Sequence, residues 1–158
     1  MIKTNWNTGS NDSITFSNII EQIKKHTLLK GTVYIGTDSF FIKDDCIFAT
    51  AICLYGADNQ QGGRYFFTKS KINKNKFPEL SIRMIKEAEN TINLSNTIMD
   101  EVPNAMLELH LDISPQENNE GTSHLAKMLV GYVKGSGYEC KIKPYAFAAA
   151  SIADKHSK

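Results

Sequence analysis

The sequence predicts a single α/β domain with a mixed five-stranded sheet and helices on both faces. Its 158 residues suit one domain, and a chain of this length can bury roughly 70% of the surface that it exposes when unfolded. Five segments have the β-branched and aromatic residues, or the two-residue alternation, that are typical of strands. The segments around them carry apolar residues at helical spacing.

The N-terminal part is predicted to be a flexible leader followed by a helix. Residues 1–13 contain several Asn, Ser and Thr residues and show no apolar period, so we expect them to lie outside the domain, which would then span residues 14–158. Isoleucines recur at helical spacing within Phe16–Leu29 and predict an N-terminal helix there.

Three consecutive strands are predicted after this helix, over Thr32–Phe41, Cys46–Tyr55 and Arg64–Lys71. A short turn joins the first two, and a glycine-bearing loop joins the second to the third, so an antiparallel meander is expected. The second strand is apolar on both faces, which indicates a central position in the sheet.

Helices and strands alternate in the rest of the chain. We expect a long helix from Pro78 to about Met99, a strand over Met106–Ile113, a helix from Thr122 or Ser123 to Gly135, a strand over Tyr138–Lys143, and a last helix between Pro144 and about His156. A right-handed crossover after the third strand places the fourth strand beside the first and parallel to it. The predicted strands then lie in the order 3-2-1-4-5, which is the ribonuclease H-like topology.

Charge and cysteine content narrow the functional classes. The formal net charge is +1, which is less basic than a dedicated nucleic-acid binder usually is. The three cysteines have no paired spacing, so they indicate reduced core residues of a cytoplasmic protein. No apolar run is long enough to cross a bilayer, and we expect no membrane association.

Asp38 is the first candidate site residue, because it lies inside an otherwise apolar strand. A carboxylate there is costly unless it is paired or bound to a metal ion. Gly36, on the same face, leaves room for a close approach to the backbone. The alternative is that Asp38 ends the strand and accepts hydrogen bonds from a turn.

Asp112 is the second candidate, at the end of the alternating fourth strand and on the face that also carries His110. It could instead belong to a solvent-facing side. In the predicted topology, however, Asp38 and Asp112 lie on neighbouring parallel strands near the same end. Two adjacent carboxylates repel unless a cation lies between them, and hard cations such as Mg²⁺ prefer oxygen ligands. The pair therefore predicts metal-assisted phosphoryl chemistry with Mg²⁺ or Mn²⁺.

Further residues are candidates for the same site. Glu87 and Glu89 flank the buried face of the long helix equally, so geometry does not choose between them. Asp154 in the last helix could add a ligand, or be a solvated residue near the chain end. His110 could contact a substrate phosphate, but a structural histidine bonded to a neighbouring strand is the simpler interpretation. Two basic runs, which include Lys69, Lys71 and Lys143, could bind a phosphate backbone or be solvated loop lysines.

Several motifs in order along the chain resemble the YkuK-type family of small bacterial and phage proteins. The motifs are Tyr34-Ile35-Gly36-Thr37-Asp38-Ser39, Gly63-Arg64-Tyr65-Phe66, His110-Leu111-Asp112-Ile113, Gly131-Tyr132-Val133-Lys134-Gly135, Lys141-Ile142-Lys143-Pro144 and the tail from Ala150 to Lys158. The resemblance runs from about residue 31 to residue 158. It implies a ribonuclease H-like fold and a predicted, largely uncharacterised nuclease activity.

The resemblance also implies a ligand set. It supports Asp38 and Asp112 as metal ligands, favours Glu87 over Glu89, and implies Asp154 as a further ligand. Relatives tend to have an acidic residue directly after the Lys-x-Lys-Pro motif, where this chain has Tyr145. The site is therefore either incomplete or completed by Asp154.

The function expected from the sequence is hydrolysis of phosphodiester bonds in RNA or DNA by two Mg²⁺ or Mn²⁺ ions, with water as the nucleophile. Asp38, Glu87, Asp112 and Asp154 would hold the metals, and Lys69, Lys71, His110 and Lys143 would bind the substrate. The alternative is a ribonuclease H-like module that binds nucleic acid or a protein partner without catalysis. The sequence leaves the choice between RNA and DNA and the oligomeric state open.

Overall fold

A computed structural model describes residues 5–114 and 120–158 of the chain. Its elements, in chain order, are β1 (Trp6–Thr8), β2 (Ser13–Ile14), α1 (Phe16–Leu28), β3 (Thr32–Ile42), β4 (Asp45–Tyr55), β5 (Arg64–Asn73), η1 (Lys74–Lys76), α2 (Leu80–Glu101), β6 (Met106–Leu111), α3 (Glu120–Gly135), β7 (Glu139–Lys141), η2 (Ala148–Ala153) and α4 (Asp154–Ser157). After residue 15, the longer helices and the strands follow the sequence prediction, whereas the 3-10 helix η1 was not predicted and the last predicted helix is mostly the π-helix η2.

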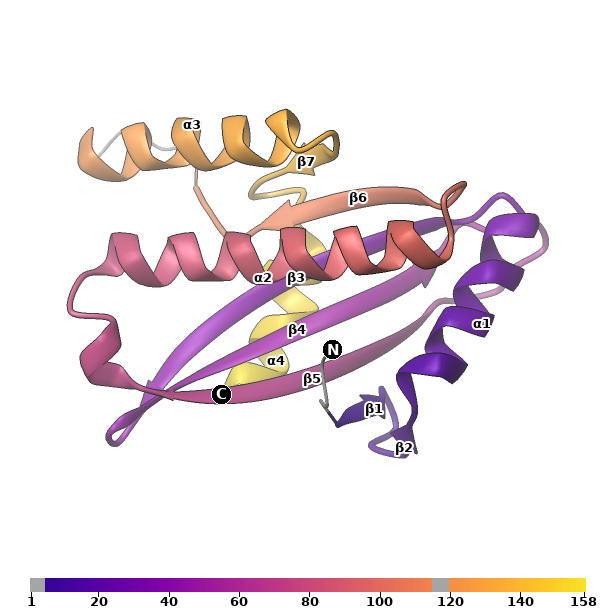
Figure 1. The fold of residues 1–158 in the computed structure, drawn as a ribbon, viewed down its shortest axis with the longest axis horizontal. Helices are drawn as coiled ribbons and strands as arrows, with labels where there is room; N and C mark the ends of the chain where they lie inside the picture. Colours follow the sequence, from indigo (N-terminus) through magenta and orange to yellow (C-terminus); the bar gives the residue numbers. More distant parts are fainter. Residues whose placement is uncertain (1–4, 115–119) are drawn as a thin grey trace.

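The strands form one mixed sheet in the order β2-β1-β5-β4-β3-β6-β7 (Figure 1). The strands β3, β4 and β5 form the antiparallel meander, and β6 pairs parallel with β3. This corrects the predicted sheet of five strands: there are seven, and the complete order differs from 3-2-1-4-5 by the two short strands added beyond β5.

Those two strands come from the segment that the sequence analysis assigned to a leader. Trp6 is buried in the core, and residues of β1 pair with Phe66–Thr68 of β5. These strands were not predicted, because β1 and β2 are only three and two residues long and too short to show a period. The hydrophobic contact of Trp6 with the ring of Phe16, at 5.9 Å between ring centroids, instead fixes this segment to α1.

Helices cover both faces of the sheet, but unequally. The helices α1 and α2 lie in front of it in Figure 1, and α4 lies behind. The core on the front face has two parts: Val33 and Ile35 pack with α1 and α2, and Leu109 and Leu111 pack with α2 and α3. On the other face, the small residues of η2 pack against Ala51 and Cys53 of β4.

Near the β3–β4 hairpin, β3 extends beyond the end of its neighbour β6, and this difference in strand length positions the site. The backbone pairing between β3 and β6 ends at Thr37 and Leu111, whereas β3 continues to Ile42. A strand predicted to reach Ile113 thus ends two residues earlier. Asp38 therefore lies where the neighbouring strand departs, which opens the sheet at this point.

Candidate active site

Asp38 is buried at this opening, with 6% of its surface exposed. Ser157 of α4 donates a hydrogen bond from its hydroxyl to Asp38 Oδ2 at 3.0 Å. The pKa of Asp38 is raised to about 7. Burial is the largest cause, and hydrogen bonds from the protonated carboxyl to Asp154 and Asp112 contribute as well. The structure thus brings three carboxyl groups to one point.

Asp112 follows directly after β6, and continuing the β3–β6 register by one residue places it beside Asp38. Its Oδ1 lies 2.9 Å from Nζ of Lys143. This buried oxygen has no hydrogen-bond partner among the described residues. Its charge is balanced by the Lys143 ammonium in an ion pair.

Glu87 reaches the same opening from α2, on the other side of β3. Two threonine hydroxyls, of Thr37 and Thr91, hydrogen-bond at 2.8 Å and fix α2 against β3. One turn before Thr91, Glu87 accepts a hydrogen bond from the Ser39 hydroxyl to Oε2 at 2.5 Å. Of the two glutamates that sequence geometry left open, Glu87 is therefore the one that faces the site.

The environment of Glu87 disfavours its charged form. Burial raises the pKa of Glu87 to about 8, and the charges of Asp38 and Asp112 raise it as well. The Ser39 hydrogen bond and the Arg83 guanidinium act in the opposite direction but are weaker. A proton or a cation must therefore accompany these acids.

Asp154 completes the group from α4. Lys158 forms an ion pair with Asp154 Oδ1 at 2.8 Å. Burial acts to raise the pKa of Asp154, but the hydrogen bonds from Lys158 and from Asp38 outweigh it and the pKa is lowered. Tyr145 is 73% exposed on the surface, whereas Asp154 hydrogen-bonds with Asp38.

Three of the four acids line a pocket of about 210 Å³. Asp38, Glu87 and Asp112 form its acidic wall, and Arg83 supplies a positive charge. Arg83 was missed by the sequence analysis. Its guanidinium lies 4.6 Å from the centre of the Phe41 ring, and its Nε is buried without a hydrogen-bond partner among the described residues. The sequence could have indicated Arg83, because it lies one helical turn before Glu87 and therefore on the same side of the helix.

His110 does not reach this pocket. Its side chain is fully buried, Nε2 lies 2.7 Å from Glu108 Oε2, and Nδ1 accepts a hydrogen bond from the backbone of Ala148. Burial lowers the pKa of His110, which favours the neutral ring. The substrate-binding role considered for it has no support in this geometry, because Nε2 contacts Glu108 on the same strand and Nδ1 links β6 to η2.

The predicted lysines lie at different distances from the acids. Lys143 is at the site, paired with Asp112. Lys69 and Lys71 lie on β5, two strands away from β3, and Lys71 makes a long ion pair of 3.9 Å with Asp45. All three lysines are exposed and can contact a bound ligand.

The donor chemistry at the pocket fits a hard cation, since the acids offer only oxygen atoms. As the side chains lie, no group of three or more Asp, Glu, His or Cys residues in the described part of the chain could hold a metal ion by itself. The feature that fits a cation is the Asp38–Asp112 pair, with one carboxyl of raised pKa beside one oxygen that lacks a hydrogen bond.

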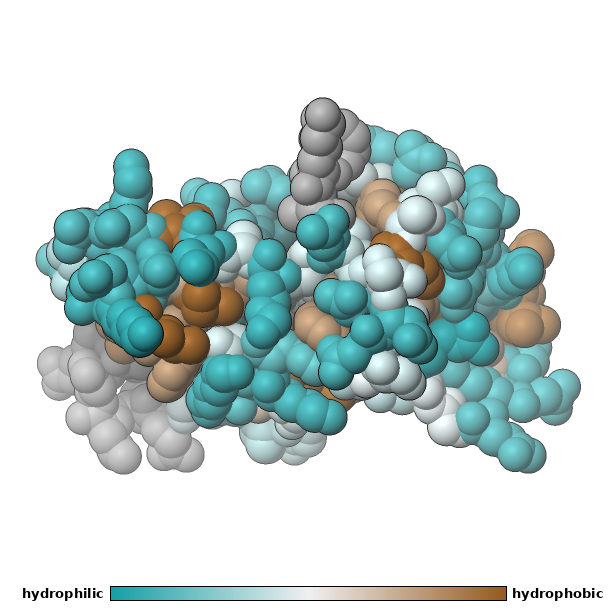
Figure 2. Space-filling model, turned by 90° about the horizontal axis from the view of Figure 1, so that it is seen from below, coloured by the Kyte–Doolittle hydropathy of each residue, from teal (hydrophilic) through white to brown (hydrophobic). Residues whose placement is uncertain are grey.

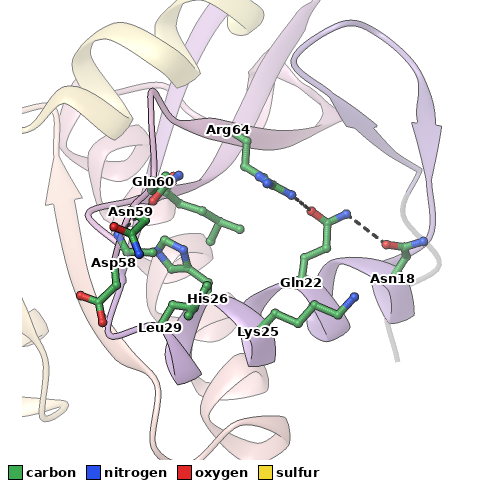
Figure 3. A pocket seen from close by; sticks show the side chains of 11 residues that line it. Asn18, Gln22, Lys25, His26, Leu29, Asp58, Asn59, Gln60 and Arg64 are labelled. Atoms are coloured by element: carbon green, nitrogen blue, oxygen red, sulfur yellow. Dashed lines mark hydrogen bonds between the residues drawn. The ribbon is translucent and has the colours of Figure 1, made fainter.

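A larger pocket, of about 490 Å³, lies at the opposite end of the sheet, between α1 and the β4–β5 loop (Figure 3). Its polar side chains are largely bonded to the protein itself. Arg64 donates to Gln22, and Gln22 donates to Asn18. The ring Nε2 of His26 lies within 3.1 Å of two backbone carbonyls. These contacts hold α1 to the sheet, so the smaller acidic pocket is the better candidate for chemistry.

A comparison of the sequence with family models supports a ribonuclease H-like fold. The family described as "Ribonuclease H-like" matches residues 15–158 of the chain. No curated protein and no solved structure matches. Within residues 5–114 and 120–158, no helix is long and apolar enough to cross a membrane.

Proposed function

Since this chain belongs to the ribonuclease H-like family, we propose that it hydrolyses phosphodiester bonds of RNA or DNA with Mg²⁺ or Mn²⁺. The observation that carries the proposal is that Asp38 of β3, Glu87 of α2 and Asp112 at the end of β6 line one pocket, with Asp154 of α4 hydrogen-bonded to Asp38. Burying several acids together is costly. A cation site explains why the fold retains them.

In this proposal, Asp38 and Asp112 hold the metal ions, Glu87 adds a ligand from α2, and Asp154 adds one from α4. Bound metal ions supply an activated water as nucleophile and stabilise the leaving oxygen. Ser39 and Ser157 hold the carboxyl groups of Glu87 and Asp38 in place by their hydrogen bonds. Metal binding requires deprotonated carboxylates, so Asp38 and Glu87 must lose the protons that their raised pKa values favour.

The test is cleavage of labelled single-stranded, duplex and hybrid oligonucleotides in Mn²⁺. Asp38→Asn should lower the rate by at least about a hundredfold, since loss of an outer-sphere partner already costs roughly 10–100-fold in metal sites. Asp58→Asn, an exposed aspartate at the opposite end of the sheet, is the matched control and should keep full activity. Cleavage that survives Asp38→Asn would contradict the assignment.

A second candidate function is nucleic-acid or protein binding without catalysis. The observation that favours it is the pairing of two acids with lysines, Asp112 with Lys143 and Asp154 with Lys158. Such pairs neutralise the site without a metal ion. Calorimetric titration with Mn²⁺ separates the two candidates: a catalytic site binds the ion and loses it in Asp112→Asn, whereas a binding module gives no heat of binding in either protein.

Within the family, we place the chain in the YkuK-type branch as a further proposal, on the motifs around Asp38, Asp112 and Asp154. We also propose that the protein works in a reducing, cytoplasmic environment, because Cys46, Cys53 and Cys140 are free thiols. Nucleic acid is the proposed partner.

A further inference from the structure

Exposed apolar residues gather where β3 runs past the acidic pocket. Phe40, Phe41 and Ile42 follow Asp38 and Ser39 directly along the strand, and each is about 40% exposed. In the space-filling view, hydrophobic atoms lie among hydrophilic ones at the end of the molecule that holds the β3–β4 hairpin, on the left in both views (Figure 2). Apolar side chains grouped at the surface beside a site are candidates for ligand contact.

The strand pairing places Phe40 on the same face of the sheet as Asp38. Residues directly opposite each other on paired strands share a face. One row across β3, β4 and β5 is therefore Asp38, Ala49 and Lys69, and the next row is Phe40, Ile47 and Lys71. The rows are about 7 Å apart.

The face that carries these rows is open beyond α4. His156 stacks on Phe67, one row before Lys69, with ring centroids 3.6 Å apart. Ser157 donates a hydrogen bond to Asp38, in the row before Phe40. Among the described residues, Phe40 and Lys71 of the next row are exposed, so this row is accessible.

The chemistry of this surface matches a single nucleic-acid strand. An exposed aromatic ring stacks on a base, and neighbouring lysines pair with the phosphates. Lys69 and Lys71 lie two strands from the ring and the acid, so one strand of nucleic acid can contact both. A base inside a duplex is already stacked and paired, and its face is not available to a protein ring.

We propose that the substrate of this site is single-stranded nucleic acid, bound across the open face with a base on Phe40 and its backbone along Lys69 and Lys71. The inference rests on the proposed function. The inference adds that the substrate is single-stranded and that Phe40 selects it, because only an unpaired base can stack on the Phe40 ring.

Binding can be measured separately from catalysis. Fluorescence anisotropy in EDTA would compare a labelled 12-nucleotide single strand with the same sequence as a duplex, using the full chain. We expect the single strand to bind more tightly. Phe40→Ala should weaken its binding about tenfold, Phe40→Trp should preserve it, and Lys71→Ala should reduce the salt dependence of binding by about one unit of slope.

Two substitutions serve as controls. Tyr132→Ala removes an exposed aromatic ring on α3, and Lys25→Ala removes an exposed lysine on α1 at the other end of the sheet. Both should leave single-strand binding unchanged. Circular dichroism and thermal unfolding of Phe40→Ala and Phe40→Trp would establish that both variants fold.

The outcomes distinguish this inference from the proposed function. Equal affinity for the duplex, or unchanged binding in folded Phe40→Ala, would overturn the inference. So would sedimentation that shows a dimer dissociating in Phe40→Ala, since the patch would then bind a second copy. Single-strand binding by a protein that cleaves nothing in Mn²⁺ would support the surface and contradict the nuclease. Cleavage in Mn²⁺ without a preference for single strands would support the nuclease and contradict the inference about the Phe40 surface.

Discussion

Two individual residues at the pocket lower the stability of the folded protein when they are charged. Asp38 and Glu87 are buried acids whose raised pKa values show that the folded protein disfavours their charge. Asp38 was identifiable from the sequence, because an acid within an apolar strand is unusual. Glu87 was not separable from Glu89, since the two flank the same helical face and only the packing of α2 on β3 selects one.

Glu87→Gln is predicted to stabilise the metal-free protein at neutral and basic pH. The folded-state pKa of Glu87, about 8, lies above its unfolded value of about 4.5. The folded state therefore binds the proton more tightly, and its free energy of unfolding falls as the pH rises from about 4.5 to 8. Glutamine removes this loss, so the variant should match the parent protein near pH 4 and exceed it by about 4 kcal/mol at pH 8.

Urea unfolding in EDTA across this pH range measures the effect, with Glu89→Gln as the control on the same helix. A free energy of unfolding that depends on pH equally in both variants would contradict the account of Glu87. The same variant should lose cleavage activity, which would separate the functional from the structural role of this acid.

At the scale of elements, the close approach of η2 to β3 brings α4 to the acids. A Cβ atom on residue 36 would lie 2.5 Å from the backbone nitrogen of Ala149, so Gly36 is required for this contact. His110 adds a second link, because its ring nitrogen accepts a hydrogen bond from Ala148. The sequence analysis expected a close approach at Gly36, but the partner, η2, is more than a hundred residues away along the chain.

Gly36→Ala is predicted to displace η2 and α4 from the sheet. Overpacking of this kind costs roughly 1–3 kcal/mol. Gly131→Ala is the opposite control, because nothing lies within 4 Å of the added Cβ and alanine favours the helix by up to about 1 kcal/mol. Thermal unfolding should show a lower midpoint for the first variant and an unchanged or higher one for the second.

Hydrogen exchange locates the effect of Gly36→Ala. Faster exchange should be confined largely to residues 146–157, with reduced cleavage because Asp154 and Ser157 move away from Asp38. Unchanged exchange in this segment, together with full activity, would contradict the predicted displacement of η2 and α4.

For the whole molecule, the sheet is extended by β1 and β2, which join the N-terminal segment to the core. Trp6 belongs to β1. Its ring contacts Phe16 of α1, and its backbone pairs with β5. Trp6→Ala should lower the free energy of unfolding by about 3 kcal/mol, as is typical for deleting a buried aromatic ring. Trp6→Phe should restore most of it. Urea denaturation would measure both, and a loss below about 0.5 kcal/mol in Trp6→Ala would indicate a segment that contributes little to the core.

The sequence by itself determined the α/β class, the meander, the parallel strand beside β3 and the pairing of Asp38 with Asp112. These follow from hydrophobic period and from the handedness of crossovers, which are local or general rules. The tertiary structure alone decided that seven strands form the sheet in the described part of the chain, that Glu87 and not Glu89 lines the pocket, and that both ring nitrogens of His110 contact other protein groups. It also placed Arg83 against Phe41 and left the Phe40 face open. Each depends on contacts between distant segments, which a one-dimensional period does not encode.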